Sequence, residues 1–205
     1  DCLLSRGLGD VYKRQISECE KAGNADMVYE FASTSKVTFP GSGMAALASS
    51  AANLADIKKY LTIQTIGYDK LNQLRHVRYF KNLDGLKAHM KKHADFLRPK
   101  FEATLKVLDD ELTGLGIGTW SEPRGGYFIS FDSLPGCAKA IVSMCKEAGV
   151  VLTNAGATFP YGKDPRDSNI RIAPSFPTPE EMSEAAELFV LCVKLVSVDK
   201  LLESK

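Results

Sequence analysis

A lysine beside a run of hydroxyl side chains is the first feature of this sequence that could do chemistry. Lys36 follows Ser-Thr-Ser at residues 33–35, and Gly41 and Gly43 come shortly after it. Hydroxyl groups and free backbone N–H groups in a loop are the donors that a phosphate needs. A lysine whose amine is desolvated and lies near another cation can form a Schiff base with a carbonyl compound. A solvated surface charge is the commoner role of lysine, and spacing alone leaves both readings open.

Arg171 is the second candidate, within the strand-like segment Asn169–Ala173. On a strand, Ile170 and Ile172 would point to one face and Arg171 to the other. A planar guanidinium there could make two parallel hydrogen bonds to a carboxylate. Taken by itself, an arginine that faces water is the favoured interpretation, and only a functional role for Lys36 would change it.

The histidines do not form a metal site in the sequence. His89 and His93 are four residues apart, as metal ligands on a helix can be, but Met90 stands where the metalloprotease motif requires glutamate. We therefore predict no metal ligands, with His93 partly under an apolar stripe and His76 in a structural role. The glycines near Lys36 also lack the Gly-Lys-Ser/Thr ending of a Walker loop.

The elements around Lys36 are predicted to be short. Residues 28–32 have the character of a strand, and residues 33–43 are rich in small and turn-forming residues, which favours a loop. We expect a small-residue helix from Met44 to about Leu54, and a further helix from Asp69 to Phe80. Lys36 would then lie in a loop that follows a strand.

A long amphipathic helix is the clearest element of the sequence, with Asp84 as its expected N-cap and Gly114 as its stop. Pro99 lies inside it and is expected to kink it, since proline removes one backbone donor and crowds the preceding turn. One apolar stripe recurs at intervals of three or four residues: Leu86, Met90, His93, Leu97, Phe101, Leu105, Leu108 and Leu112.

The remainder of the chain alternates between strand and helix patterns. Segments 126–132, 150–152 and 169–173 are predicted strands, and residues 135–148 a helix. Thr178-Pro179-Glu180-Glu181 is a capping box with proline at the first helical position, so a final helix begins there. The sequence therefore predicts an α/β protein.

Composition excludes several classes of function. The 205 residues include 26 basic and 25 acidic ones, a net charge of +1, which gives no electrostatic footprint for nucleic acid or a membrane surface. Apolar stretches are too short to cross a bilayer, and the first residues lack the design of a secretory signal. Five widely spaced cysteines without a Cys-x-x-Cys pair fit reduced thiols, Cys137 and Cys145 being buried fillers. We predict a cytoplasmic protein.

Phe31–Lys36 with its glycine-rich turn closely resembles the cofactor-lysine segment of fold-type I pyridoxal-phosphate-dependent aminotransferases. Later landmarks follow in the family's order: Pro123–Phe128, the glycine-containing run 149–162 and Asn169–Ala173. The segment Asp69–His76 resembles a bacterial class I-related subgroup that includes aspartate aminotransferases.

The resemblance implies a domain plan. Residues 16–83 would be the carboxy-terminal part of the cofactor-binding large domain, and residues 84–205 the α+β small domain, entered through the helix kinked near Pro99. Residues 1–15 resemble translated adapter sequence and are predicted to be a non-native leader. A homodimer is implied too, because family active sites lie at the subunit interface.

The resemblance also implies roles for individual residues. Lys36 would bind pyridoxal 5'-phosphate covalently and shuttle the substrate proton, Ser33 would bind the cofactor phosphate, and Arg171 would bind the substrate α-carboxylate. The substrates would be an amino acid, aspartate being favoured, and a 2-oxo acid such as 2-oxoglutarate. For a distal substrate carboxylate the sequence offers only weak candidates, which are Lys70, Arg75 and Arg124.

Two departures from the family pattern matter. Met44 stands eight residues after the lysine, where many relatives carry a phosphate-binding arginine. The family's other cofactor contacts precede the lysine, so we predict that this chain alone is inactive. Two alternatives remain open: an aminotransferase-like effector domain of a transcription regulator, and a non-catalytic dimerising remnant.

Overall fold

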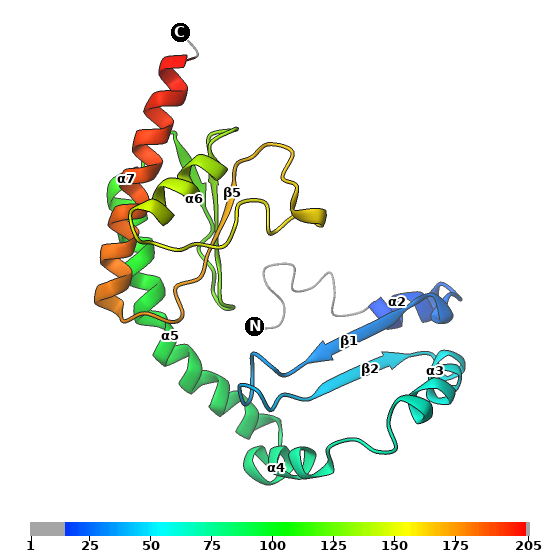
Figure 1. Cartoon of the computed structure of the whole chain (residues 1–205). Helices are drawn as coiled ribbons and strands as arrows, with labels where there is room; N and C mark the ends of the chain where they lie inside the picture. The colour runs from blue at the N-terminus through cyan, green and yellow to red at the C-terminus, as the bar shows by residue number, and fades with distance from the viewer. Residues whose placement is uncertain (1–14, 204–205) are drawn as a thin grey trace. The chain divides into compact units, whose positions relative to one another are not determined.

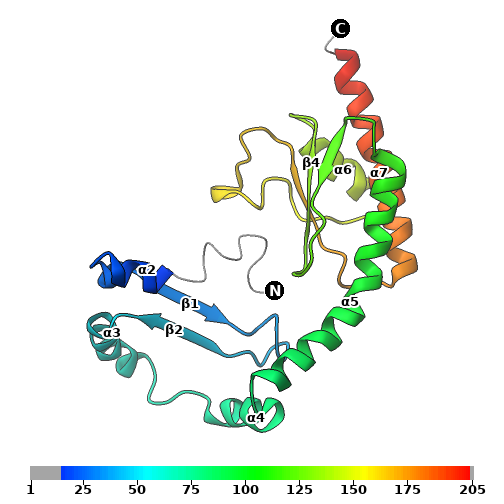
Figure 2. The same ribbon diagram turned by 180° about the vertical axis from the view of Figure 1, so that it is seen from behind.

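The computed structural model describes residues 15–203 (Figures 1 and 2). The chain divides into two compact units, one ending at Ala94 and the other beginning at Asp95. The division falls within helix α5 (Leu83–Leu112), whose first residue is next to the predicted domain boundary. Both units contain helices and strands, so the predicted α/β class is confirmed.

The first unit is built around a β-hairpin. Strand β1 (Tyr29–Ser33) pairs antiparallel with β2 (Ala45–Ser49), and Ser33 lies opposite Ala45 at the end where the connecting loop begins. This loop carries Lys36, as the sequence predicts. The helical elements of the unit before α5 are α2 (Gln15–Lys21), the 3-10 turn η1 (Ala25–Met27), α3 (Ala51–Gln64) and α4 (Lys70–Phe80).

The helix predicted from Met44 to Leu54 is wrong in its first half. Residues 45–49 pair with β1 and form strand β2, so the tertiary pairing overrides the high helix propensity of alanine. Helix α3 begins only at Ala51, where the Ser50 hydroxyl accepts a hydrogen bond from Asn53 N at 3.2 Å.

Of the N-caps predicted for helices α4 and α5, the first is confirmed and the second is wrong. Asp69 caps α4 by accepting a hydrogen bond from Asn72 N at 2.9 Å, as expected. In α5, however, the cap is Asn82, whose Oδ1 accepts from Gly85 N at 3.0 Å, so Asp84 lies inside the first turn. Asp84 is displaced because an asparagine two residues earlier already satisfies the free N–H group. Pro99 lies within α5, which is helical on both sides of it.

The second unit holds a three-stranded antiparallel sheet in the order β3 (Gly118–Trp120), β4 (Ile129–Ser133), β5 (Asn169–Ile172). Strand β3 was not predicted, since three residues are too few to show a period. The strand predicted at residues 150–152 is wrong, because these residues form a loop. The remaining elements are α6 (Ala138–Glu147), the 3-10 turn η2 (Pro160–Gly162) and α7 (Pro179–Glu203).

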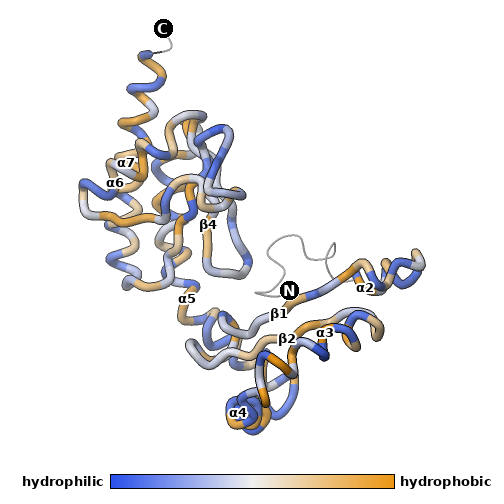
Figure 3. The backbone as a smooth tube through the Cα atoms, turned by 45° about the vertical axis from the view of Figure 1, so that its right-hand side comes forward, coloured by the Kyte–Doolittle hydropathy of each residue, from blue (hydrophilic) through white to orange (hydrophobic). Residues whose placement is uncertain are grey.

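The core of the second unit lies on one face of this sheet. Ile129 is paired with Ile172 and Phe131 with Ile170, and all four side chains are buried. Helices α5, α6 and α7 add buried apolar residues to the same cluster, Leu108, Ile141 and Val193 among them. Figure 3 shows hydrophobic residues recurring along β4 and α7.

The capping box predicted for the last helix is confirmed. Thr178 N donates to Glu181 Oε2 at 2.8 Å, and Glu181 N donates to Thr178 Oγ1 at 3.2 Å. Within residues 15–203, no helix is both long enough and apolar enough to cross a membrane.

Candidate active site

The loop that carries Lys36 is closed by paired hydrogen bonds at its base. Thr34 N donates to Met44 O at 2.7 Å, and Met44 N donates to Thr34 Oγ1 at 2.7 Å. Thr34 and Met44 therefore form the neck of the loop, one residue beyond each end of the hairpin. The Met44 position that departs from the family pattern thus holds the loop through its backbone.

Inside the loop the chain makes one tight helical turn around Lys36. The N–H groups of Val37 and Thr38 both donate to Thr34 O, at 2.9 Å each. Val37 and Thr38 are 4% and 2% exposed, whereas the side chain of Lys36 is exposed. The turn thus has a buried second half and an exposed lysine at its centre.

Two serine hydroxyls lie at the start of the same turn. Ser33 Oγ is 2.7 Å from Ser35 Oγ and accepts a hydrogen bond from Ser35 N at 3.2 Å. Gly43 packs against Ser35 so closely that a Cβ at position 43 would lie 2.8 Å from Ser35 Cα. The glycine-rich end of the loop therefore serves close backbone packing beside the serines. Ser33 and Lys36, the two predicted cofactor ligands, occur together in this turn.

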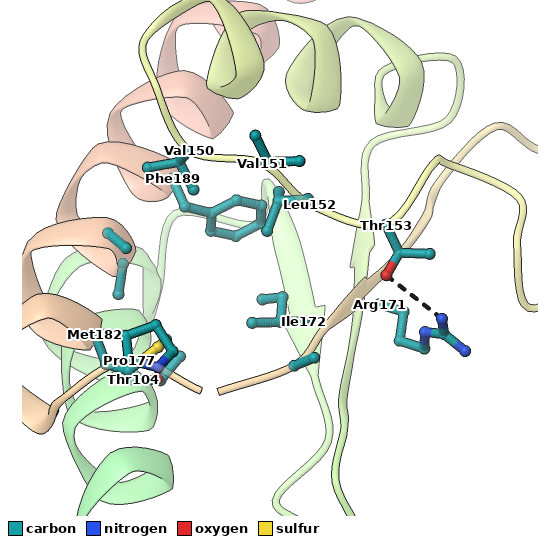
Figure 4. Close-up of a pocket in the computed structure, with 13 residues that line it drawn as sticks. Thr104, Val150, Val151, Leu152, Thr153, Arg171, Ile172, Pro177, Met182 and Phe189 are labelled. Atoms are coloured by element: carbon teal, nitrogen blue, oxygen red, sulfur yellow. Dashed lines mark hydrogen bonds between the residues drawn. The ribbon is translucent and has the colours of Figure 1, made fainter. Parts of the chain in front are cut away.

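Arg171 is presented by β5 on the sheet face opposite the core, as predicted. Its guanidinium lies over the ring of Phe128, with Cζ 4.4 Å from the ring centroid. Nη2 is 3.4 Å from Thr153 Oγ1, and Figure 4 shows the guanidinium turned toward Thr153. Nε is buried and has no hydrogen-bond partner within residues 15–203, and no described carboxylate pairs with the guanidinium. The group is oriented by an aromatic ring and retains unused donors.

An apolar pocket of about 170 Å³ lies beside β5 in the second unit. Its walls come from the loop after α6, from β5 and from α7, and they include Val150, Leu152, Ile172, Met182 and Phe189. The Arg171 side chain points away from Ile172 and Phe189 in Figure 4. Arg171 and Thr153 also line the pocket, which is otherwise an apolar extension of the core cluster.

One buried cation was missed by sequence reasoning. Lys100 is 5% exposed, and its Nζ donates to Ser175 O at 2.9 Å and to Phe176 O at 3.2 Å. It thereby fixes the loop that follows the Arg171 strand. A lysine next to Pro99 on an amphipathic helix carries no signal of this role, because its partners are backbone carbonyls far away in the sequence.

His93, Cys137 and Cys145 have pKa values that are shifted by their surroundings. Among the described residues, no group of three metal-ligating side chains occurs. Burial, and to a smaller extent repulsion by His89, lowers the pKa of His93. Cys137 and Cys145 are buried as predicted, and burial with the neighbouring Cys192 thiol raises the pKa of Cys145 to about 12. Such a thiol is a poor nucleophile at neutral pH.

Comparisons with known proteins place the chain in a family. The family model described as aspartate amino-transferase matches residues 4–205. A Mycolicibacterium smegmatis protein described as an aminotransferase is 44% identical over 184 residues, and a Corynebacterium glutamicum aspartate aminotransferase is 42% identical over 180. A crystal structure of an aminotransferase from Corynebacterium diphtheriae, 44% identical, superposes with a TM-score of 0.86 over 90% of this chain.

This fold is that of the aminotransferases. The chain belongs to the aspartate aminotransferase family. Its matches cover 90% and 88% of this chain but only 43% and 42% of the M. smegmatis and C. glutamicum relatives, and 45% of the C. diphtheriae structure. The chain therefore spans less than half the length of these relatives, in line with the predicted carboxy-terminal portion of the fold.

Proposed function

We propose that this chain supplies the cofactor lysine and the substrate-carboxylate arginine of a pyridoxal-phosphate-dependent transaminase. The favoured reaction moves the amino group of aspartate to a 2-oxo acid such as 2-oxoglutarate. The observation that carries the proposal is the turn at Lys36, in which an exposed lysine precedes two buried residues and lies beside two exposed serines. A solvated surface lysine needs no such arrangement.

The residues of this turn fit the cofactor's chemistry. The hydroxyls of Ser33 and Ser35 are exposed and bond mainly to each other, so either can rotate toward a phosphate. Met44 supplies no charge, but Arg75 is exposed and its Nη1 is 3.4 Å from Ser42 Oγ in the same loop. A cation and two hydroxyls are a chemically suitable set of phosphate ligands.

When bound, the cofactor supplies an aldehyde for the amino group and an electron-withdrawing ring. Lys36 would hold the cofactor and then, as a free amine, carry the proton removed from the substrate α-carbon. Arg171 would bind the α-carboxylate through two parallel hydrogen bonds, which orients the adjacent C–H bond. Phe128 would keep the guanidinium plane fixed, because stacking restricts its rotation.

The wider setting is proposed on the same basis. We expect a cytoplasmic homodimer that binds amino-acid and 2-oxo-acid substrates and neither nucleic acid nor membrane. Since the family's other cofactor contacts precede the lysine, we also expect the 205-residue chain alone to bind cofactor without turning substrate over.

Covalent trapping tests the lysine directly. The chain is incubated with pyridoxal phosphate, reduced with borohydride and mapped by mass spectrometry, with Lys36→Arg as the matched control. Lys36 should be modified well ahead of exposed lysines such as Lys139. Modification spread over all exposed lysines, or unchanged in the control, would count against the proposal.

Catalysis is tested in a joined protein, a chimera in which this chain replaces the matching part of the C. glutamicum aspartate aminotransferase. Oxaloacetate formed from aspartate and 2-oxoglutarate is followed through its reduction to malate by NADH, with added malate dehydrogenase as the coupling enzyme. We expect activity, and its loss to background in Lys36→Ala. A well-folded joined protein that is active with the alanine variant would overturn the assignment.

A further inference from the structure

A buried histidine, His76 on α4, has no part in the proposed reaction but contacts the Lys36 loop. It is 4% exposed. Its Nδ1 is 2.8 Å from Asn72 O in the preceding turn of the helix, and its Nε2 is 2.9 Å from Thr38 Oγ1. The imidazole therefore bridges helix α4 and the second half of the turn that presents Lys36.

The partners of the ring determine where its proton lies. A carbonyl oxygen can only accept, so Nδ1 carries the proton and donates to Asn72 O. In the neutral ring Nε2 is then an acceptor, and the Thr38 hydroxyl can donate to it at 2.9 Å. The same hydroxyl also lies 3.2 Å from Thr34 O and 3.0 Å from Thr34 Oγ1, so the contact with His76 is the shortest of three contacts of Oγ1. The helix backbone thus selects the tautomer that can receive the Thr38 proton.

Thr38 is the anchored end of the turn. Its N–H donates to Thr34 O at 2.9 Å, and its carbonyl accepts from His89 Nε2 at 3.1 Å. Lys36 lies between Thr34 and Thr38, so any movement of Thr38 changes the direction in which the lysine projects. With Oγ1 held by His76, Thr38 is fixed through its backbone and its side chain at once.

The same face of α4 also holds the other limb of the loop. Asn72 Nδ2 donates to Ser42 O at 2.9 Å and to Gly43 O at 3.3 Å. Asn72 and His76 are four residues apart and so lie on one helix face. Asp69 caps the helix that presents them. Residues 69–76, which the sequence associates only with a subgroup of the family, thus hold the Lys36 loop through hydrogen bonds.

We propose that His76 is a positioning residue for Lys36, acting through the hydrogen bond between its Nε2 and the Thr38 hydroxyl. This inference rests on the proposed role of Lys36. The competing explanation is that the ring only fills space, since it also packs against Phe39 and Phe80 with centroid distances of 5.1 Å and 5.7 Å. The two explanations differ in whether the hydrogen bond made by Nε2 contributes to the position of Lys36.

Two substitutions at the same position separate them. His76→Gln places a carbonyl oxygen near the position of Nε2, so it can still accept the Thr38 proton. His76→Asn is shorter and retains a donor only near the position of Nδ1, so the bond to Thr38 is lost. Thr38→Val removes the hydroxyl with little change of shape and leaves His76 in place, so a result remains if His76→Asn unfolds the first unit. It also removes the contacts of Oγ1 with Thr34, so the comparison of His76→Gln with His76→Asn is what isolates the bond to His76.

Hydrogen exchange of the 205-residue chain gives the first readout and needs no cofactor. The amides of Val37 and Thr38 should exchange about tenfold faster in His76→Asn, the effect of losing one hydrogen bond. In Thr38→Val they should exchange at least as fast, because the contacts with Thr34 are lost too. His76→Gln should stay close to the unsubstituted chain. Amides of β4 and β5 in the second unit serve as the internal control.

Lys36 trapping with pyridoxal phosphate and cyanoborohydride, relative to Lys139, gives the second readout. The ratio should fall severalfold in His76→Asn and Thr38→Val and be restored in His76→Gln. Equal effects of Gln and Asn, or no effect of Thr38→Val, would show that the ring only fills space and would overturn the inference. If exchange responds as expected but Lys36 is never preferred, the hold of His76 on the turn is supported and the proposed function fails.

Discussion

The guanidinium of Arg171 is held in place by its neighbours but keeps hydrogen-bond donors that none of the described residues uses. Phe128 lies under it at 4.4 Å, Thr153 is a long 3.4 Å from Nη2, and Nε has no hydrogen-bond partner in the described chain. A structural arginine at a strand edge would have a carboxylate or several carbonyls as partners. At this scale, the unused donors favour a ligand that brings its own acceptors.

Replacing Arg171 with lysine tests that view, since charge is kept and the planar fork is lost. We expect kcat/KM for aspartate in the joined protein to fall by about 10–100-fold, the cost of charge-assisted hydrogen bonds at about 1.5–3 kcal/mol. Phe128→Leu should cost less, about 0.5–1 kcal/mol, because only the stacking is removed. Equal activity of Arg171→Lys and the parent would show that no carboxylate is bound there.

His93 gives the first unit a predicted dependence on pH. Burial and the nearby His89 lower the pKa of His93 from 6.5, so the unfolded chain binds more protons than the folded one just below that pH. Stability should be full above pH 6.5, fall as the pH drops below it, and level off once the folded histidine is protonated. Urea unfolding followed by circular dichroism should show this loss, and His93→Gln should reduce it. An unchanged pH profile in that variant would contradict the assignment.

At the scale of elements, helix α7 begins at a reciprocal cap, with hydrogen bonds of 2.8 Å and 3.2 Å between Thr178 and Glu181. Thr178→Ala removes the side-chain acceptor for Glu181 N at the exposed start of the helix, and should lower the stability of the second unit by about 1 kcal/mol. Fluorescence of Trp120, which lies in this unit, reports the urea midpoint. Glu184→Ala, one turn further on, is the matched control and should change little.

Local signals in the sequence were enough to predict some helices and strands but not others. The cap at Asp69 and the box at Thr178 are local, and both were predicted correctly. The stripe of α5 was predicted only in part, since Leu108 and Leu112 are its buried members and Lys100, Thr104 and Val107 are buried outside it. Strand β2 was missed because its alanines become a strand only by pairing with β1. Residues 150–152 are apolar but form a loop, since they line a pocket instead of joining a sheet.

The candidate site shows the same limit. The Lys36 loop and the outward face of Arg171 follow from residue types and alternation, so both could be predicted. The groups that hold the loop could not be, because His76 meets Thr38 across 38 positions and His89 meets it across 51. Sequence patterns identify what a residue can do; these long-range hydrogen bonds decide how it is oriented.

On the scale of the whole chain, the two units differ sharply in how much they bury. The buried apolar cluster extends from Val107 to Val196 and lies entirely in the second unit. In the first unit, the apolar residues buried within the described chain are only Val37 and Phe80, while Phe31, Ile63 and Leu71 are 77%, 83% and 79% exposed. Burial of apolar surface is the main source of stability, so the first unit should be the weaker one.

We therefore expect the 205-residue chain to unfold in two phases. Circular dichroism should show an early loss of helix in urea, before the fluorescence of Trp120, the one tryptophan in the sequence, begins to change. Leu108→Ala should move only the fluorescence transition, by about 2–5 kcal/mol, because Leu108 is fully buried in the second unit. Val37→Ala should move only the early phase. If both probes instead reported a single transition that shifted with either substitution, the two units would be energetically one, and the Lys36 loop would owe its stability to the core that surrounds Leu108.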